Sequence, residues 1–305
     1  MILIITHLII PVGLILFTYI GKSRCKLDWF LKQIIVVLYL AILHITGSWH
    51  EINYYLRYVF ELAYISGAVI SYLRIRPERF LGKRNIALWL FTAVAILICA
   101  FLYATSTPLA AYNYNVEPVN LSFPFRNGVY AIINGGNGEK SKFMNQHFYA
   151  TQFVQRGISS MVRFAIDIEK LNTFGFSNNK YGSKELDDYP IYGEILYSPC
   201  DGSIITASDD LQDEKIGPNE LKVGSGNTIV IKMKDIYIML GHLQKGSISV
   251  KVGDSVKTGQ PIARAGNSAS GIPHLHIQAT KFGFVEGVPI IFDGWFPVKN
   301  NLFFK

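Results

Sequence analysis

The sequence predicts a protein of two parts: an N-terminal all-α transmembrane bundle of four helices in residues 1–106, and a C-terminal, mostly β domain in residues 107–305. Three observations predict this. Half of the 305 residues are hydrophobic and only 17% are charged. Long apolar runs are confined to the first part, whereas Gly, Asn, Ser and Pro become frequent after about residue 111. This composition excludes a disordered or fibrous protein, and the length suffices for about two domains.

The predicted bundle rests on four apolar runs, at residues 2–20, 34–49, 58–73 and 86–105. The first and fourth are close to the roughly 20 residues that cross a bilayer as a helix. The second reaches that length if it extends back to Trp29. The third is the weakest, because it is short and carries Glu61.

Charge predicts the orientation of these helices. Residues 1–110 hold ten Lys/Arg and four Asp/Glu, so most of the net charge of +7 lies in the apolar half. The first and third connections carry most of these cations, and positively charged loops stay in the cytoplasm. We therefore expect a multi-pass protein of the cell membrane, with the lipid bilayer as partner and the C-terminal domain outside. A charge distributed in this way argues against nucleic acid as a partner.

The C-terminal part is predicted to be an antiparallel sheet or sandwich, because it consists of short apolar runs separated by turn signals. The expected strands are 128–133, 163–168, 202–207, 228–233, 236–240, 247–250, 261–265 and 274–279. Residues 169–195 form a long polar stretch, which we interpret either as one wall of a cleft or as a surface excursion.

Candidate site residues come from the histidines and one aspartate of this part. His274 and His276 are two apart on an expected strand, so they share a face. His242 follows an apolar strand, where it is either a site residue or a hydrogen-bonded core histidine. Asp167 interrupts an apolar run, and ionised carboxylates are rarely buried unless they are paired or bind a metal. His147 lies in a segment without periodicity.

Taken together, residues 134–296 resemble the lysostaphin-type zinc metallopeptidases, which cut peptide links in bacterial cell walls. The resemblance is carried by the order and spacing of five blocks, namely SPCDG at 198–202, GNTIVI at 226–231, GHL at 241–243, VKVGDSVKTGQ at 250–260 and GNSASGIPHLH at 266–276. The block at 250–260 also resembles hairpins of biotin- and lipoyl-carrier domains, but a carrier role leaves the histidines unexplained.

The resemblance implies a site for one Zn²⁺. In that family, a His and an Asp of a first motif and the second His of the His-x-His pair hold the metal. This implies that Asp167 and His276 are ligands, and that His242 and His274 are catalytic residues that handle protons and the developing oxyanion. Three nitrogen or oxygen ligands leave a fourth position open for water, as a catalytic zinc requires.

One departure concerns the first motif, which is usually His-x-x-x-Asp. Arg163 stands where the His is expected, and a guanidinium cannot ligate zinc. We expect His147, from an earlier loop, to be the third ligand; the alternative is a degenerate site that binds zinc weakly. Arg163 would pair with a substrate carboxylate or with a nearby acid, and Asn145 is a second candidate for substrate contact.

The sequence therefore predicts a membrane-anchored zinc metalloendopeptidase, a hydrolase acting on peptide bonds of peptidoglycan at the periplasmic or extracellular side of a bacterial cell membrane. The alternative is a catalytically weak or inactive peptidase-like domain that serves as a binding or regulatory module of the envelope.

Overall fold

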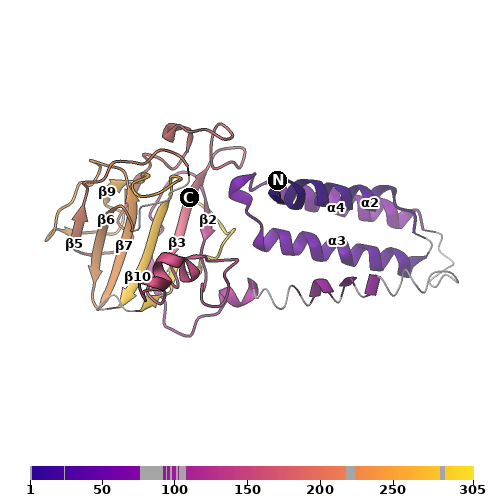
Figure 1. Cartoon of the computed structure of the whole chain (residues 1–305), viewed down its shortest axis with the longest axis horizontal. Helices are drawn as coiled ribbons and strands as arrows, with labels where there is room; N and C mark the ends of the chain where they lie inside the picture. The colour runs from indigo at the N-terminus through magenta and orange to yellow at the C-terminus, as the bar shows by residue number, and fades with distance from the viewer. Residues whose placement is uncertain are drawn as a thin grey trace. The chain divides into compact units, whose positions relative to one another are not determined.

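The computed structural model describes residues 2–23, 25–75, 92–93, 95–96, 98–100, 102, 108–217, 224–281 and 286–305. The chain divides into two compact units, Met1–Thr107 and Pro108–Lys305 (Figure 1). Most of the fourth predicted run, 86–105, lies outside the described residues.

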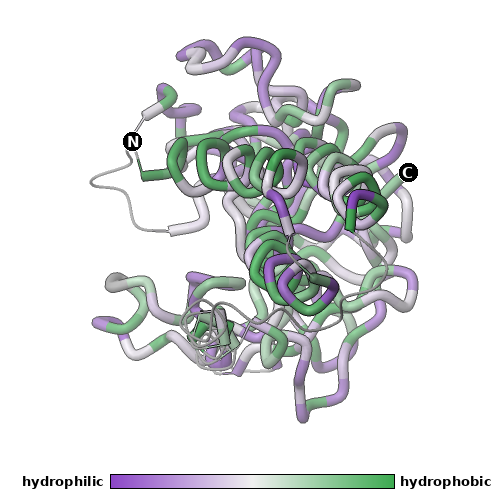
Figure 2. The backbone as a smooth tube through the Cα atoms, turned by 90° about the vertical axis from the view of Figure 1, so that its right-hand side faces the viewer, coloured by the Kyte–Doolittle hydropathy of each residue, from purple (hydrophilic) through white to green (hydrophobic). Residues whose placement is uncertain are grey.

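The first unit is helical. Its first apolar run is continuous helix made of α1 (Ile2–Ile4), the π-helical η1 (Ile5–Ile9) and α2 (Ile10–Ile20). α2 contacts both α3 (Lys26–Thr46) and α4 (Leu56–Leu73), and the short η2 (Trp49–Glu51) lies between α3 and α4 in the chain. The helices seen nearly end-on in Figure 2 are coloured mainly hydrophobic.

Two helical segments of the described residues are long and apolar enough to cross a membrane, Ile2–Ile20 and Lys26–Thr46. α4 is not one of them, and it carries both Arg57 and Glu61. Two candidate spans are thus present, while the bundle of four membrane helices stays a prediction.

The second unit is a mostly antiparallel β domain, which confirms the predicted class. Its main sheet has the order β13 (Leu302–Phe304), β2 (Val129–Asn134), β3 (Ile166–Leu171), β10 (Leu275–Lys281), β7 (Ile236–Leu243), β6 (Asn227–Met233), β5 (Gly202–Ser208) and β8 (Ser255–Val256), and β11 (Gly287–Val288) pairs with β10. Two small sheets accompany it: an antiparallel pair of β4 (Ile195–Tyr197) and β9 (Pro261–Arg264), and a parallel pair of β1 (Val119–Leu121) and β12 (Ile290–Phe292).

The central strands are apolar and buried, which explains why they form the core. In β10 every residue except Lys281 is buried, and β6 and β7 contribute Ile229, Ile231 and Leu240 to the same cluster. Burial of such side chains stabilises the fold by about 1.5–3 kcal/mol each. Short helices lie in the connections: η3 (Pro108–Tyr112), η4 (His147–Tyr149), α6 (Thr151–Gln155) and η5 (Leu186–Asp188).

Two expected strands differ from the structure. The expected strand 163–168 begins only at Ile166, because Ala165 N–H bonds to Val162 O in a turn. The expected strand 247–250 does not form. There Ile248 N–H bonds to the Asp209 carboxylate and Ser247 N–H closes a turn onto Gln244 O, so these amides do not join a ladder.

Candidate metal centre

The register of the main sheet brings the predicted site residues together. β10 lies between β3 and β7, and His276 is paired with Asp167 on one side and with Gly241 on the other. His242 follows Gly241 directly. Residues more than 100 positions apart in the sequence therefore meet at one end of three neighbouring strands.

A β-bulge re-aims His242. Between the paired positions Ile229–Leu240 and Asn227–Leu243, β7 has two residues where β6 has one. His242 takes a left-handed backbone conformation, φ 59°, which is uncommon for a residue with a side chain and clusters at functional sites. Gly241 is needed beside it, because a Cβ there would lie 2.8 Å from the backbone oxygen of Ser225.

His147, Asp167 and His276 form a potential metal site. One ligand atom from each lies within 4.8 Å of the others. The Asp167 carboxylate is the hub: Oδ2 lies 3.1 Å from His147 Nε2, and Oδ1 lies 2.9 Å from His276 Nδ1. Asp167 and His276 are each only 5% exposed, so an isolated charge here would be strongly destabilising without a partner.

Asn145 determines which ring nitrogen of His147 carries the hydrogen. The Asn145 amide donates from Nδ2 to Gly136 O and to Ala165 O, both at 2.9 Å, so its Oδ1 must be the acceptor. Oδ1 lies 2.8 Å from His147 Nδ1, which therefore carries the hydrogen. His147 Nε2 is left with its lone pair facing Asp167, as a metal ligand requires.

Gln278 determines the tautomer of His276. Its Oε1 lies 3.0 Å from His276 Nε2, so Nε2 donates and Nδ1 is free to ligate. The carboxylate has its own orienting partner, because Asn134 Nδ2 donates to Asp167 Oδ2 at 2.9 Å. All three candidate ligand side chains are thus oriented by a further hydrogen bond.

His242 and His274 lie beside the three candidate ligands. Their ring centroids are 4.7 Å apart, and His274 Nε2 lies 3.6 Å from Asp167 Oδ1. Each donates from Nδ1 to a backbone carbonyl at 2.8 Å, His242 to Ser268 O and His274 to Ile272 O. Their Nε2 atoms are consequently acceptors, the form needed to take a proton.

Burial and mutual contact shift the pKa values of this cluster. Burial opposes ionisation of Asp167, but the imidazoles of His147 and His274 outweigh it and hold the pKa of Asp167 well below its usual range. Burial, reinforced by His274 and His276, lowers the pKa of His242 to about 3, and burial also lowers the pKa of His274. The pKa of His276 is raised, because contact with Asp167 outweighs burial. At neutral pH the site offers an anionic carboxylate and two neutral imidazoles that accept protons.

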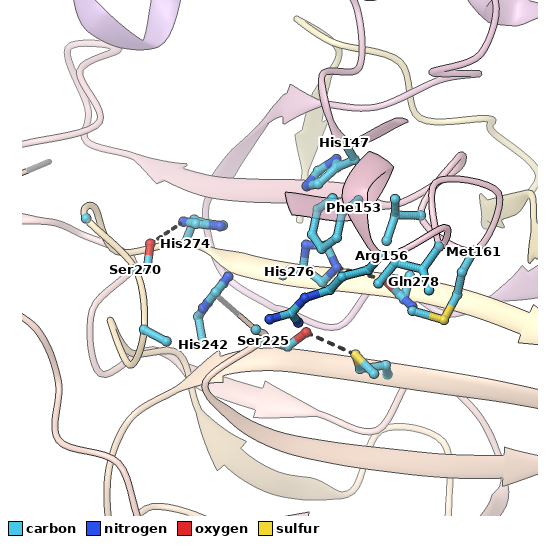
Figure 3. Close-up of a pocket in the computed structure, with 16 residues that line it drawn as sticks. His147, Phe153, Arg156, Met161, Ser225, His242, Ser270, His274, His276 and Gln278 are labelled. Atoms are coloured by element: carbon cyan, nitrogen blue, oxygen red, sulfur yellow. Dashed lines mark hydrogen bonds between the residues drawn. The ribbon is translucent and has the colours of Figure 1, made fainter. Parts of the chain in front are cut away.

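These histidines open onto a cleft of about 380 Å³ (Figure 3). His147, His242, His274 and His276 all line it, and its further walls come from residues 153–162 and from the segments around Ser225 and Ser270. The polar stretch 169–195 contributes no residue to the lining of this cleft, so of its two interpretations the surface excursion agrees with the lining.

Arg163 and Asn145 also lie outside the residues that line the cleft. Arg163 pairs with Glu139 at 2.9 Å, which answers the choice left open for this residue in favour of a nearby acid. Asn145 is fully buried, and its amide is occupied by backbone and by His147. In the structure both side chains are thus engaged within the protein.

Comparison with known proteins identifies the domain. The model of Peptidase family M23 matches residues 188–289. The C-terminal half is a peptidase family M23 domain. A curated relative, "Outer membrane antigenic lipoprotein B" from Histophilus somni, is 32% identical over 36% of this chain and 29% of its own length. The chain thus spans less than a third of that relative.

Solved structures similar to the M23 domain include lysostaphin from Staphylococcus simulans, at 23% identity over 40% of both chains with a TM-score of 0.27. A zinc-containing peptidase from Vibrio cholerae is 22% identical over 57% of this chain and 39% of its own, with a TM-score of 0.33.

Zinc is the metal of M23 peptidases, and the residues present fit it. Two imidazole nitrogens with fixed lone pairs and one buried carboxylate are a usual donor set for a catalytic zinc. His147 and Asp167 precede the segment matched by the family model, so their assignment depends on the geometry described above.

Three residues of the site were not predicted from the sequence: Asn134, Gln278 and Arg156. Gln278 was accessible to sequence reasoning, because it continues the alternation of His274 and His276 on one strand face. Asn134 was not, because a register shift between Ile132 and Asn134 brings it opposite Asp167. Nothing in the sequence around Arg156 marks it.

Proposed function

We propose that this protein is a membrane-anchored zinc metalloendopeptidase that hydrolyses peptide bonds of bacterial peptidoglycan. The observation that carries the proposal is the convergence of His147, Asp167 and His276 with ligand nitrogens already selected by Asn145 and Gln278. A binding or regulatory module would not need either the complete donor set or these orienting hydrogen bonds.

In the proposed mechanism His147, Asp167 and His276 hold the metal. Bound zinc lowers the pKa of water toward neutrality and polarises a carbonyl oxygen. The neutral His242 and His274 present Nε2 atoms at the cleft, where one accepts a proton and can later deliver it to the leaving amine. Their backbone acceptors, Ser268 O and Ile272 O, keep both rings in this tautomer.

The membrane part of the proposal is a multi-pass anchor that holds the domain on the outer side of a bacterial cell membrane. Two candidate spans support it. The basic residues also gather at one end of the first unit: Arg74 donates to Tyr19 O at 2.7 Å, and Lys32 donates to Lys22 O at 3.1 Å. Such an end is expected in the cytoplasm. A name containing "outer membrane" for the curated relative agrees with an envelope protein.

The test of the enzymatic part uses the full chain purified in detergent. We expect about one tightly bound zinc per chain and chelator-sensitive release of muropeptides from peptidoglycan. His147→Ala should lose the zinc, and His44→Ala, which removes a histidine of the other unit, should keep it. A chain without zinc, or unchanged occupancy in His147→Ala, contradicts the proposal.

The orientation is tested separately. A reporter fused after Lys305 should be active only on the outer side of the membrane. A reporter that is active in the cytosol rules out cell-wall peptides as the substrate.

A further inference from the structure

We infer that Arg156 binds a carboxylate of the substrate peptide and thereby makes the cleft selective for acidic peptides. The inference rests on the proposed function and deepens it, because it names the chemical class of substrate. It starts from Arg156 because, among the described residues that line the cleft, its side chain is the one that carries a permanent charge.

The local sequence fixes the position of Arg156. It is the C-cap of α6, and Gly157 follows it with φ 68°. Gly157 N–H bonds to Val154 O at 3.0 Å and Ile158 N–H to Phe153 O at 3.0 Å, the two hydrogen bonds of a Schellman motif. The motif holds the backbone of Arg156 between Phe153 and Ile158, which line the cleft with it.

The side chain of Arg156 points into the cleft. In Figure 3 its guanidinium extends away from the α6 side toward Ser225 and His242. The residue is exposed, and none of the described residues that line the cleft is acidic.

The other arginines of the unit have partners within the protein. Arg163 is paired with Glu139, Arg126 donates to Gly259 O at 3.0 Å, and Arg264 donates to Gly193 O at 2.6 Å. Within the described residues Arg156 has neither an ion pair nor a side-chain hydrogen bond. Its donors are available to a ligand.

The chemistry of the guanidinium defines that ligand. Its planar N–H groups match a carboxylate with two parallel hydrogen bonds, and the apolar neighbours Phe153, Ile158 and Met161 reduce screening by water. Peptidoglycan stem peptides offer two such groups, a terminal carboxylate and an internal glutamyl carboxylate.

The experiment measures binding of a stem tetrapeptide that the enzyme does not cleave to the zinc-loaded full chain. Two modified peptides are measured beside it, one with the terminal carboxylate and one with the internal carboxylate converted to an amide. We expect the wild type to bind the unmodified peptide about 10- to 100-fold more tightly than one of the two amides, which identifies the recognised group. Arg156→Gln should abolish this preference, and Arg156→Lys should keep part of it.

The matched control is Lys142→Gln, which removes the same charge from an exposed position that does not line the cleft. It should retain the wild-type preference, and all variants should retain zinc. A wild type without preference, or a preference that survives Arg156→Gln, overturns the inference. If the chain cleaves no peptidoglycan but shows the Arg156-dependent preference, the proposed function fails and the inference stands.

Discussion

Two histidine–carboxylate contacts, one in each unit, can be compared directly. His276 Nδ1 lies 2.9 Å from Asp167 in the M23 domain, and His44 Nδ1 lies 2.5 Å from Glu61 between α3 and α4. The side chains of the first pair are 6% and 7% exposed, and those of the second 34% and 37%. Only the first has a third donor within reach, His147, among the described residues. A short contact therefore does not make a metal site; convergence, burial and a fixed tautomer do.

The largest expected effect comes from removing the charge of Asp167, the carboxylate that contacts the histidines of the buried cluster. Asp167→Asn replaces the anionic ligand by a neutral amide of the same size. Since a bound metal supplies several kcal/mol of transition-state stabilisation, we expect zinc to be lost and kcat/KM to fall at least about 1,000-fold. Metal analysis and muropeptide release measure both. Glu61→Gln, the same change in the exposed pair, should alter neither; a zinc-replete Asp167→Asn chain would remove Asp167 from the ligand set.

Removing one of the two imidazoles that we propose to handle protons should have the next largest effect. His274→Ala and His242→Ala leave the three ligands in place, so zinc should stay bound. General acid–base groups contribute about 100- to 10,000-fold, and kcat should fall by that order. Zinc content and steady-state kinetics on the same preparation separate this result from ligand loss. Full activity of both variants would assign proton transfer elsewhere.

Sequence reasoning was sufficient to single out the five side chains that the structure brings together, but not the residues that hold them in place. His274, His276 and Asp167 could be recognised from their spacing and from a carboxylate within an apolar run. His147 required the family resemblance, since it lies 20 residues before Asp167 in an irregular segment. The bulge that turns His242 toward the cleft depends on the pairing of β6 with β7, which local sequence does not encode.

The same limit applies to the fold. The central strands were predictable because they are continuous apolar runs, whereas the segment 247–250 alternates like a strand but bonds to the Asp209 carboxylate. Arg156 had no sequence signal at all, because what distinguishes it is the absence of an ion-pair partner in the described fold.

An intermediate effect is expected for Gln278, which touches no substrate in this mechanism and acts through His276. Gln278→Met keeps the volume and removes the acceptor, so His276 is no longer held in its ligating tautomer. We expect zinc affinity to fall about 10- to 100-fold. Gln278→Glu keeps an acceptor and should restore most of the affinity. Competition with a fluorescent chelator measures both, and equal affinities in the two variants would show that Gln278 only fills space.

The pH dependence of zinc binding should follow His276. Its pKa is raised by contact with Asp167, and a protonated imidazole cannot ligate. Zinc affinity should therefore be full above this pKa and decline as the pH falls through it, starting at a higher pH than the ordinary value near 6.5 would give. The lowered pKa values of His242 and His274 keep both neutral in that range. Activity and zinc occupancy should thus fall together as the pH is lowered. Loss of activity while zinc stays bound would contradict the assignment of the acid limb to His276.

The smallest effect is expected at the exposed pair. Glu61→Gln removes the charge that faces His44, but both side chains are about one-third exposed. Exposed ion pairs contribute about 0–1 kcal/mol, so the thermal midpoint of the full chain in detergent should move by only a few degrees. Zinc content should not change. A large loss of stability would mean that the pair lies in a medium of low dielectric constant, where an unpaired histidine or carboxylate is far more costly. That outcome would place the pair inside the bilayer and support α4 as a third span.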